Sequence, residues 1–365
     1  MSIISNNTCK SRDLILEHFK KYPALRIDDV MKFVFQSSFG CEHLVSDEQR
    51  AVAYIREEYE NVGSLDNATP WIEKLDGAFS RVNLSVLSDG LSPETLGRLF
   101  CLSAKETVSN SVSVLEEKLK VVREMINEGL LPFDQSQLEE FCSVWKSGGY
   151  KAIRHSQTFR DAYSPAYRVI SDKYVDFLPL FIEIDKLLSR GSAIIAIEGP
   201  CASGKSTLAQ MLESVYDCNV FHMDDFFLRP EQRTPRRMNE IGGNVDRERF
   251  QKEVLGDLAL GNDVSFRPFN CSKWDLDDPI SISFKKLSVV EGVYSMHTDL
   301  AGYYDLSVFL DIDRGLQNKR ILKRNSPEFA KKFFEIWIPL EDQYFEKMNV
   351  KSRCSLTIPI LDKEL

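Results

Sequence analysis

The spacing of apolar residues along the chain predicts two halves that are built differently. From the N-terminus to about residue 190, apolar residues recur every three or four positions, which is the period of an amphipathic helix. The clearest stretches lie at 11–22, 26–39, 47–60 and 112–130. Helix starts are expected at Ser11, at Ser46 and at Ser92, where Pro93 follows in the first turn. Alternating runs typical of strands are scarce, so this half is predicted to be all-α.

A different pattern begins after Gly191. Short runs of β-favouring apolar residues alternate with loop or helical sequence, the order expected of βαβ units around a buried parallel sheet. The predicted strands lie within 192–200, 219–223, 287–294, 306–313 and 354–360. The second half is therefore predicted to be an α/β domain.

The boundary between the halves is expected near residue 188, in an apolar helical segment that leads into the first strand. A chain of 365 residues favours two domains, at about 150 residues each. We predict a helical domain at 1–188 and an α/β domain at 189–365.

The composition excludes several classes of function. Lys and Arg total 46 against 55 Asp and Glu, a net charge of −9, so neither a nucleic-acid nor a membrane partner is expected without a local basic patch. No apolar run approaches the ~20 residues of a membrane-spanning helix, and the first residues lack the pattern of a secretion signal. The eight cysteines include no Cys-x-x-Cys pair that could hold zinc or carry out redox exchange. A disulfide framework is not expected in a chain this long with this much apolar core. A cytoplasmic protein is predicted.

The strongest chemical signal is a match to Gly-x-x-x-x-Gly-Lys-Ser/Thr, with an apolar strand before it and a helical segment after it. In this phosphate loop, glycines let backbone N–H groups approach phosphate oxygens, and the following helix adds the positive end of its dipole. Lys205 is expected to bridge the β- and γ-phosphates, and the Ser206 hydroxyl to bind Mg²⁺. The predicted nucleotide-binding residues are Gly199, Pro200, Cys201, Ala202, Ser203, Gly204, Lys205, Ser206 and Thr207.

Acidic residues follow two of the predicted strands. Ligands of a parallel sheet gather at the carboxyl ends of its strands, so these residues are expected to face the phosphate loop. Asp224 is the candidate base for the proton of an acceptor hydroxyl, whereas Asp225 is more simply explained as a cap of the next turn. Glu291 closes another strand and is the candidate partner of Ser206 in the magnesium shell.

A basic segment follows the strand at 306–313. Arg320 and Arg324 are four residues apart and therefore lie on one face of a helix. On a lid they would neutralise charge on the transferred phosphoryl group and exclude water. Taken alone, the segment would be read as a solvated basic face.

About residues 190–360 resemble the uridine kinase family of P-loop kinases, relatives of phosphoribulokinase and bacterial pantothenate kinase. The resemblance rests on IAIEGPCASGKST, MDDFF, NVDRERF, RPFNCSKW, VVEGVYSMH and FLDID followed by the arginine helix. It implies that Asp224 is the catalytic aspartate, that Glu291 is associated with the metal, and that Arg320 and Arg324 are lid arginines. It also implies a sugar-binding role for Asp246.

Around the expected acceptor site, this sequence departs from the pattern of the family that it resembles. Phe227 stands where the family has tyrosine, and Phe269 begins the segment that matches the family's base-recognising motif. Trp274 occupies the position of the base-recognising histidine, and Arg247 with Glu248 replaces a His-Pro pair. Substrate-site candidates are therefore Asp224, Phe227, Asp246, Phe269 and Trp274, although a lost hydrogen-bonding group changes specificity strongly.

The N-terminal half resembles no family of known activity. The segments around His43 and around His155 and Ser156 suggest a metal or an acid–base pair. With five histidines and no close-spaced ligand cluster, a structural role is favoured for His43.

Together these patterns predict a kinase that uses ATP and Mg²⁺ to phosphorylate a hydroxyl group of a small molecule, a nucleoside or a sugar-like compound. The alternative is a nucleotide-driven switch ATPase whose effector is the helical half. Either protein could be a homo-oligomer, which the sequence leaves open.

Overall fold

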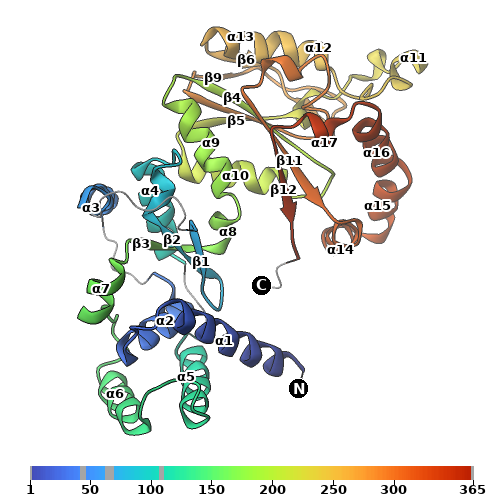
Figure 1. Ribbon diagram of the computed structural model, residues 1–365. Helices are drawn as coiled ribbons and strands as arrows, with labels where there is room; N and C mark the ends of the chain where they lie inside the picture. The colour runs from blue at the N-terminus through green and yellow to red at the C-terminus, as the bar shows by residue number, and fades with distance from the viewer. Residues whose placement is uncertain (1, 42–46, 62–69, 107–110, 363–365) are drawn as a thin grey trace. The chain divides into compact units, whose positions relative to one another are not determined.

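The chain folds into two units that divide within one helix, α9 (Leu178–Leu188). The computed structural model describes residues 2–41, 47–61, 70–106 and 111–362, and its units are Met1–Ile182 and Glu183–Leu365 (Figure 1). Among the described residues, no helix is long and apolar enough to cross a membrane.

The N-terminal unit is mainly helical, as predicted. A short 3-10 turn, η1 (Leu84–Leu87), accompanies its helices. The helices are α1 (Ser2–Lys21), α2 (Ile27–Phe39), α3 (Glu48–Asn61), α4 (Pro93–Ala104), α5 (Ser111–Asn127), α6 (Gln135–Ser147), α7 (Gln157–Tyr163) and α8 (Asp172–Val175).

The three expected helix starts have different outcomes. The Ser92 side chain accepts a hydrogen bond from the Thr95 N–H at the start of α4, with Pro93 in the first turn, as predicted. The prediction at Ser11 was wrong, because α1 already begins at Ser2. Ser46 lies outside the described residues, and the Asp47 carboxylate accepts from the first N–H groups of α3.

A three-stranded antiparallel sheet adds to this helical unit. It consists of β1 (Ile72–Lys74), β2 (Phe79–Asn83) and β3 (Tyr167–Ser171), with β2 in the centre. Strand β2 escaped the sequence analysis because Ser80 and Arg81 are buried beside Phe79 and Val82. A strand buried on both faces has no alternation of polar and apolar residues.

The C-terminal unit is built on a five-stranded parallel sheet, and its strands confirm the five predicted ones. They are β4 (Ala193–Glu198), β5 (Cys218–His222), β10 (Leu287–Glu291), β11 (Leu306–Ile312) and β12 (Leu356–Ile360). Their order is β12-β11-β4-β10-β5, and every neighbouring pair is parallel. Every residue of the central strand β4 is buried, which explains its uninterrupted apolar sequence.

Helices and helical turns connect these strands. The α-helices are α10 (Lys205–Val215), α11 (Pro235–Met238), α12 (Arg247–Phe250), α13 (Gly256–Leu260), α14 (Arg314–Arg324), α15 (Pro327–Lys332), α16 (Ile338–Lys347) and α17 (Val350–Arg353). The 3-10 turns are η2 (Met223–Phe226), η3 (Pro230–Gln232) and η5 (Ala301–Tyr303), and the π-helical turns are η4 (Gln251–Leu255) and η6 (Phe333–Trp337).

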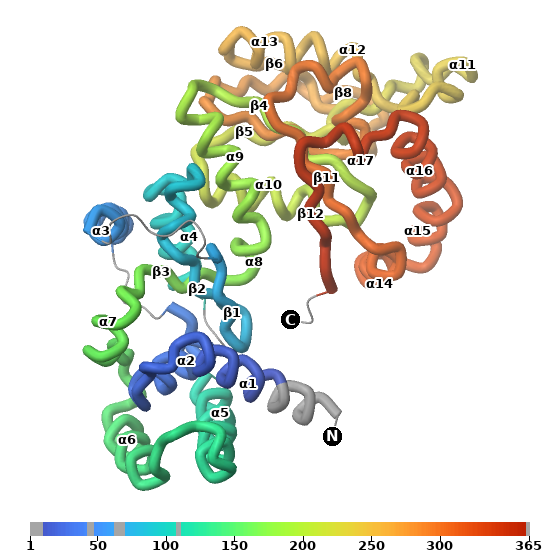
Figure 2. Tube along the Cα trace, viewed as in Figure 1, coloured from blue at the N-terminus to red at the C-terminus, as the bar shows by residue number. Residues whose placement is uncertain are grey.

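The segment between β5 and β10 also carries two small antiparallel pairs. Strand β6 (Val264–Phe266) pairs with β9 (Ile280–Ile282), and β7 (Phe269–Asn270) pairs with β8 (Asp275–Leu276). Figure 2 shows the path of the chain through this segment, with β6 and β8 labelled. The α/β fold predicted for the C-terminal half, a parallel sheet with helical connections and a phosphate loop after its first strand, is confirmed. Because the strand order reverses at β4, the carboxyl end of this strand is where a ligand crevice is expected.

Candidate active site

The phosphate loop, residues 199–204, joins the end of β4 to the start of α10. Gly199 lies at φ 143°, and a Cβ added there would come within 2.7 Å of the Leu310 carbonyl oxygen on β11. Gly204 lies at φ 105° at the helix start. Both positions need glycine, because other residues rarely adopt such angles and β11 leaves no room for a side chain at Gly199.

The start of α10 presents backbone donors. The N–H groups of Gly204, Lys205, Ser206 and Thr207 donate to no other described residue. The first N–H groups of a helix have no acceptor within the helix and carry the positive end of its dipole. They are therefore suited to bind phosphate oxygens.

Lys205 is buried against the loop that it follows. Its ammonium donates to the carbonyl oxygens of Gly199 at 2.7 Å and Pro200 at 3.0 Å. Four carboxylates lie close enough for its positive charge to act on them: Glu198, Asp224, Glu291 and Glu341. In each of them the charge of Lys205 favours the ionised form and so acts to lower the pKa. The loop lysine thus lies at the centre of an acidic site.

The two residues predicted for the magnesium shell lie side by side. The Ser206 hydroxyl donates to Glu291 Oε1 at 3.0 Å, and His222 Nδ1 lies 2.7 Å from the same oxygen. Burial opposes ionisation of Glu291, but the bonds from His222 and Ser206 and the charge of Lys205 outweigh it and lower the pKa of Glu291. An ionised carboxylate beside a hydroxyl is the kind of hard oxygen pair that Mg²⁺ binds, so these residues fit the ion.

His222 was not singled out from the sequence. It ends β5, in register with Glu291 at the end of β10. The hydrogen bond to Glu291 raises the pKa of His222. Its position at the end of a predicted strand, directly before the Met-Asp-Asp segment, was the available signal.

The two neighbouring aspartates lie in the 3-10 turn η2 after β5. The Asp224 carboxylate accepts no hydrogen bond from another described residue and is open to solvent. The surrounding protein still removes part of its hydration, and together with the charge of Glu291 this raises the pKa of Asp224. The cap expected at Asp225 was wrong, because the turn already contains Asp225 and its side chain caps nothing.

The predicted acceptor-site aromatics form a chain of ring contacts. Phe227 meets Phe269 edge-on with ring centroids 6.2 Å apart, and Phe269 meets Trp274 in the same way at 6.4 Å. Trp274 is half exposed, and the Arg233 guanidinium stacks 4.5 Å from its ring centre. The structure therefore brings these residues together, with a cation against the outermost ring.

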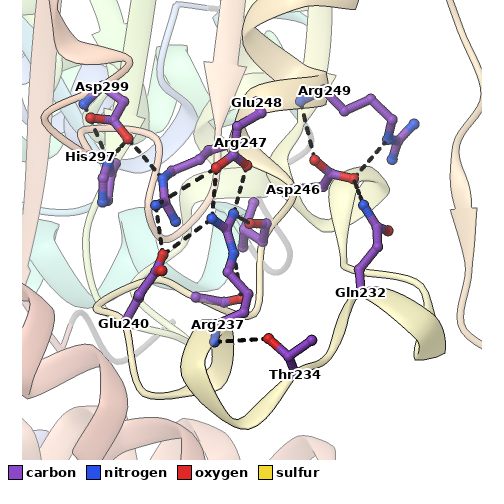
Figure 3. Close-up of polar contacts among 12 residues, drawn as sticks. Gln232, Thr234, Arg237, Glu240, Asp246, Arg247, Glu248, Arg249, His297 and Asp299 are labelled. Atoms are coloured by element: carbon purple, nitrogen blue, oxygen red, sulfur yellow. Dashed lines mark hydrogen bonds and ion pairs between the residues drawn. The ribbon is translucent and has the colours of Figure 1, made fainter.

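Asp246 is buried and fully engaged within the protein (Figure 3). Its Oδ1 accepts from the Arg249 N–H at 3.2 Å, which caps α12, and its Oδ2 accepts from Gln232 Nε2 at 2.7 Å. Arg249 Nε lies 3.7 Å from Oδ2 as an ion pair. To bind a sugar hydroxyl, Asp246 would use the remaining lone pairs of these oxygens.

Arg247 and Glu248, the departures from the family pattern beside Asp246, belong to an ion-pair network (Figure 3). Arg237 pairs with Glu248 at 2.6 Å, and Arg247 donates to Glu240 at 2.9 Å and to Asp299 at 2.8 Å. The network connects α11, α12 and the turn after β10. Arg247 and Glu248 thus hold these segments together.

Helix α14 contacts the phosphate loop through one of the two predicted lid arginines. Arg320 Nη1 donates to the carbonyl oxygens of Ala202 at 3.2 Å and Ser203 at 3.3 Å. Gln317, which the sequence analysis missed, donates to the Cys201 carbonyl oxygen at 2.9 Å. Arg324 is exposed and its guanidinium lies over the Phe333 ring, 5.4 Å from its centre. In this arrangement Arg320 supports the loop and Arg324 does not touch it.

Two buried carboxylates behind the loop were also missed. Glu341 on α16 accepts from the Cys201 N–H at 2.9 Å. Glu198, the last residue of β4, accepts from the N–H groups of Gly199 at 2.9 Å and Met296 at 3.1 Å and from the Tyr344 hydroxyl at 2.8 Å. Burial raises the pKa of Glu198 to about 7, with Lys205 and these bonds acting in the opposite direction. No sequence pattern distinguishes such residues from ordinary exposed glutamates.

Comparisons with known proteins point to solved structures alone. No family model matches the chain, and no curated protein matches its sequence. A possible uridine kinase from Bacillus stearothermophilus is 20% identical with a TM-score of 0.37; the match covers 49% of this chain and 99% of the other. Shikimate kinases from Bacteroides thetaiotaomicron and Aquifex aeolicus are 12% and 16% identical, with TM-scores of 0.26 and 0.24. They match 47% of this chain and 90% and 87% of their own.

Proposed function

We propose that the C-terminal unit is an ATP- and Mg²⁺-dependent kinase that phosphorylates a hydroxyl group of a small molecule. The observation that carries this proposal is a juxtaposition at one edge of the sheet. Unpaired N–H groups at the start of α10 lie at the end of β4, and the Asp224 carboxylate, without a hydrogen-bond donor among the described residues, follows β5. The first set suits a phosphoryl donor, and the second suits an acceptor hydroxyl.

Binding of the triphosphate is assigned to the loop amides and Lys205. The Lys205 ammonium would exchange its bonds to the Gly199 and Pro200 carbonyl oxygens for phosphate oxygens. Ser206 and Glu291 would hold Mg²⁺, which when bound offsets negative charge on the phosphates. Such an offset matters here, because carboxylates surround the loop lysine.

Transfer itself is assigned to Asp224 and the arginines of α14. Asp224 would accept the proton of the attacking hydroxyl, and its raised pKa makes it a better base than an ordinary aspartate. Arg320 already contacts the loop, whereas Arg324 would have to leave Phe333 to reach the reacting group. We therefore propose that Arg320 supports the loop and that Arg324 closes over the substrate.

The acceptor is proposed to be a nucleoside or a sugar-like compound. The ring chain of Phe227, Phe269 and Trp274 would provide an apolar wall, and Asp246 a polar contact. The resemblance to the uridine kinase family supports this class, and the replacement of the base-recognising histidine by Trp274 argues against unchanged nucleoside specificity. A cytoplasmic location remains a prediction from the sequence.

The test is acceptor-dependent formation of ADP. Purified protein with ATP and Mg²⁺ would be incubated with nucleosides, pentoses and small alcohols, and ADP and the phosphorylated product would both be measured. We expect one class to raise ADP formation and to give an equal amount of phosphorylated product. The same ATP hydrolysis with and without every acceptor would contradict the proposal and favour the nucleotide-switch alternative.

A further inference from the structure

A cavity of about 830 Å³ lies within the N-terminal unit, lined by residues of that unit alone. Helices α2, α3 and α4, the segment before α7, and strand β3 contribute to its wall. Its size is that of a site for a small organic molecule. Its wall includes Lys32, Gln36, Tyr54, Phe100, His155 and Tyr167.

One side of the cavity is a chain of hydrogen bonds with a defined direction. Asp29 is fully buried and accepts from the Ser156 N–H and hydroxyl and from the Arg26 N–H. These bonds and the one from His155 outweigh burial and lower the pKa of Asp29 to about 2, so it is an ionised acceptor. His155 Nδ1, 2.9 Å away, must therefore be the donor.

The chain of hydrogen bonds continues from His155 to Tyr167. Burial lowers the pKa of His155 to about 4, so its ring is neutral and Nε2 is an acceptor. The Tyr167 hydroxyl lies 2.6 Å from Nε2 and 3.4 Å from Gln36 Oε1, and its one proton goes to the nearer acceptor, Nε2. Its oxygen, on the cavity wall, is left as an acceptor for a ligand hydroxyl or N–H group.

Lys32 brings a positive charge to the same wall. Its half-buried ammonium donates to the Ile153 carbonyl oxygen at 2.8 Å and makes no ion pair with another described residue. Burial and the charge of Arg81 lower the pKa of Lys32 to about 8. An ammonium in this position has two further N–H donors and lacks a partner of opposite charge within contact distance.

Arg81 stands behind this wall, and its charge is paired with the Glu73 carboxylate at 3.3 Å. It is 1% exposed and lies between the rings of Phe33 and Tyr167. Its Nε donates to Gln36 Oε1 at 2.9 Å, while its buried Nη2 has no hydrogen-bond partner among the described residues. Gln36 is therefore held in place on the wall from behind.

The rest of the wall is less polar, and its charges are balanced or screened. Tyr54, Phe100 and Val169 provide apolar surface. Arg168 is neutralised by Glu58 at 2.7 Å, and Glu57 is exposed on the rim, where water screens its charge. The charge of Asp29 also acts on Lys32, but Asp29 is fully buried and is not part of the wall. The Lys32 ammonium thus remains as the inner charge that a ligand can meet.

We propose that this cavity binds a small organic anion, with its carboxylate or phosphate group on Lys32, a hydroxyl or N–H group on Tyr167, and its apolar part against Tyr54 and Phe100. The N-terminal unit would then be a second ligand-binding unit rather than a passive addition. This proposal does not depend on the kinase proposal, because no residue of the phosphate loop takes part in it.

The test is a ligand-observed NMR titration of the full chain with benzoate, phenyl phosphate and the neutral benzamide. A nonhydrolysable ATP analogue with Mg²⁺ is kept in excess, so that phosphates compete less at the phosphate loop. We expect benzoate or phenyl phosphate to bind and benzamide not to bind. The stronger of the two anions identifies the ligand's charged group.

Two variants and one control assign the site. Lys32→Met should weaken binding of the anion by about tenfold or more, the value of a charge-assisted hydrogen bond. Tyr167→Phe keeps the ring and should weaken binding of 3-hydroxybenzoate, whose hydroxyl group cannot reach its own carboxylate, more than it weakens binding of benzoate. Lys120→Met removes an exposed lysine of α5 and should leave binding unchanged.

Three results would overturn the proposal. They are the absence of binding of both anions, equal binding of benzamide and benzoate, and equal affinity of wild type and Lys32→Met. Should Lys32→Met fail to fold, as judged by circular dichroism, the Tyr167→Phe comparison decides alone, and equal loss for 3-hydroxybenzoate and benzoate then counts against the site.

Discussion

At the scale of single residues, two adjacent aspartates in the active-site turn provide a matched pair. Asp224 and Asp225 both follow β5, and both have a raised pKa because partial loss of hydration disfavours their charged forms. The charge of Lys205 acts against this rise at Asp224, whereas the charges of His222 and Arg249 do so at Asp225. The two residues therefore share chemistry and differ in position.

Asp224→Asn is expected to lower phosphoryl transfer by about 10²- to 10⁴-fold, since it removes a base that acts during the reaction. The affinity for ATP should stay nearly unchanged, because Asp224 is assigned to the acceptor. Asp225→Asn is the control and should retain most of the activity. Steady-state kinetics and equilibrium nucleotide binding would check both variants, and equal losses in the two would remove the role assigned to Asp224.

A second residue-scale prediction concerns Glu198 and pH. Burial raises the pKa of Glu198 to about 7 in the folded protein from an ordinary 4.5, so the unfolded chain releases this proton first. Between these values the folded state binds more protons, and stability must fall as the pH rises. Once the pH exceeds the pKa of Glu198 in the folded protein, its ionisation lowers the free energy of unfolding by about 3 kcal/mol, because each unit of pKa difference corresponds to 1.36 kcal/mol.

Glu198→Gln cannot ionise, so its unfolding free energy should change less with pH in this interval. Chemical denaturation of both proteins at pH 5 and pH 8 would measure the difference. We expect wild type to lose stability relative to the variant from pH 5 to pH 8. The same pH dependence in the two proteins would mean that Glu198 is ionised in the fold well below pH 7.

At the scale of elements, the phosphate loop depends on its contact with β11. The Leu310 carbonyl oxygen would lie 2.7 Å from a Cβ at Gly199, and the helix cluster of Ile321, Ala330 and Ile338 packs against Cys201 and Ala202. The loop is thus shaped from two sides by segments more than a hundred residues away in the sequence. Glycine is therefore required at position 199 both by the close approach of Leu310 and by the φ angle of the residue itself.

Gly199→Ala should therefore raise the dissociation constant for ATP by about tenfold or more, because a side chain at this φ is strained by about 1–3 kcal/mol and would also displace the loop. Gly302→Ala is the control, since a Cβ there meets no atom within 4 Å. Binding of a fluorescent ATP analogue would be measured for both. Wild-type affinity in Gly199→Ala would show that the loop adjusts around β11.

At the scale of the whole molecule, the two units have separate cores. The N-terminal core is formed by side chains of α2, α5 and their neighbours, and the other by side chains of the parallel sheet and its helices. Each unit also has its own candidate ligand site, the cavity at Lys32 in one and the phosphate loop in the other. The kinase proposal needs only the second unit for chemistry.

Hydrogen exchange with and without ATP and Mg²⁺ would test this division. Bound nucleotide should protect the phosphate loop and α14, since binding stabilises the segments that form the site. Exchange in residues 2–41 and 111–170 should stay the same. Nucleotide-dependent exchange across the helical unit would instead support a switch that signals to it.

The spacing of apolar residues in the sequence determined the helical first half and the five parallel strands. The Gly-x-x-x-x-Gly-Lys-Ser motif determined the phosphate loop between β4 and α10. These features depend on neighbours in sequence, through hydrophobic period and backbone freedom, and can be read locally. The tertiary structure decided the rest. It placed Glu198, Glu341, Gln317 and His222 around the loop, and it buried Ser80 and Arg81 in a strand without alternation.

The cavity at Lys32 is another feature that only the tertiary structure decided. Its residues come from α2, α3, α4, β3 and the segment before α7, and no short motif joins them. His155 was noticed from the sequence, but its partners Asp29 and Tyr167 were not, because the hydrogen bond to Asp29 spans 126 positions. Which polar groups meet, and how burial changes their charge, depends on packing between distant segments, and packing is decided only when the chain folds.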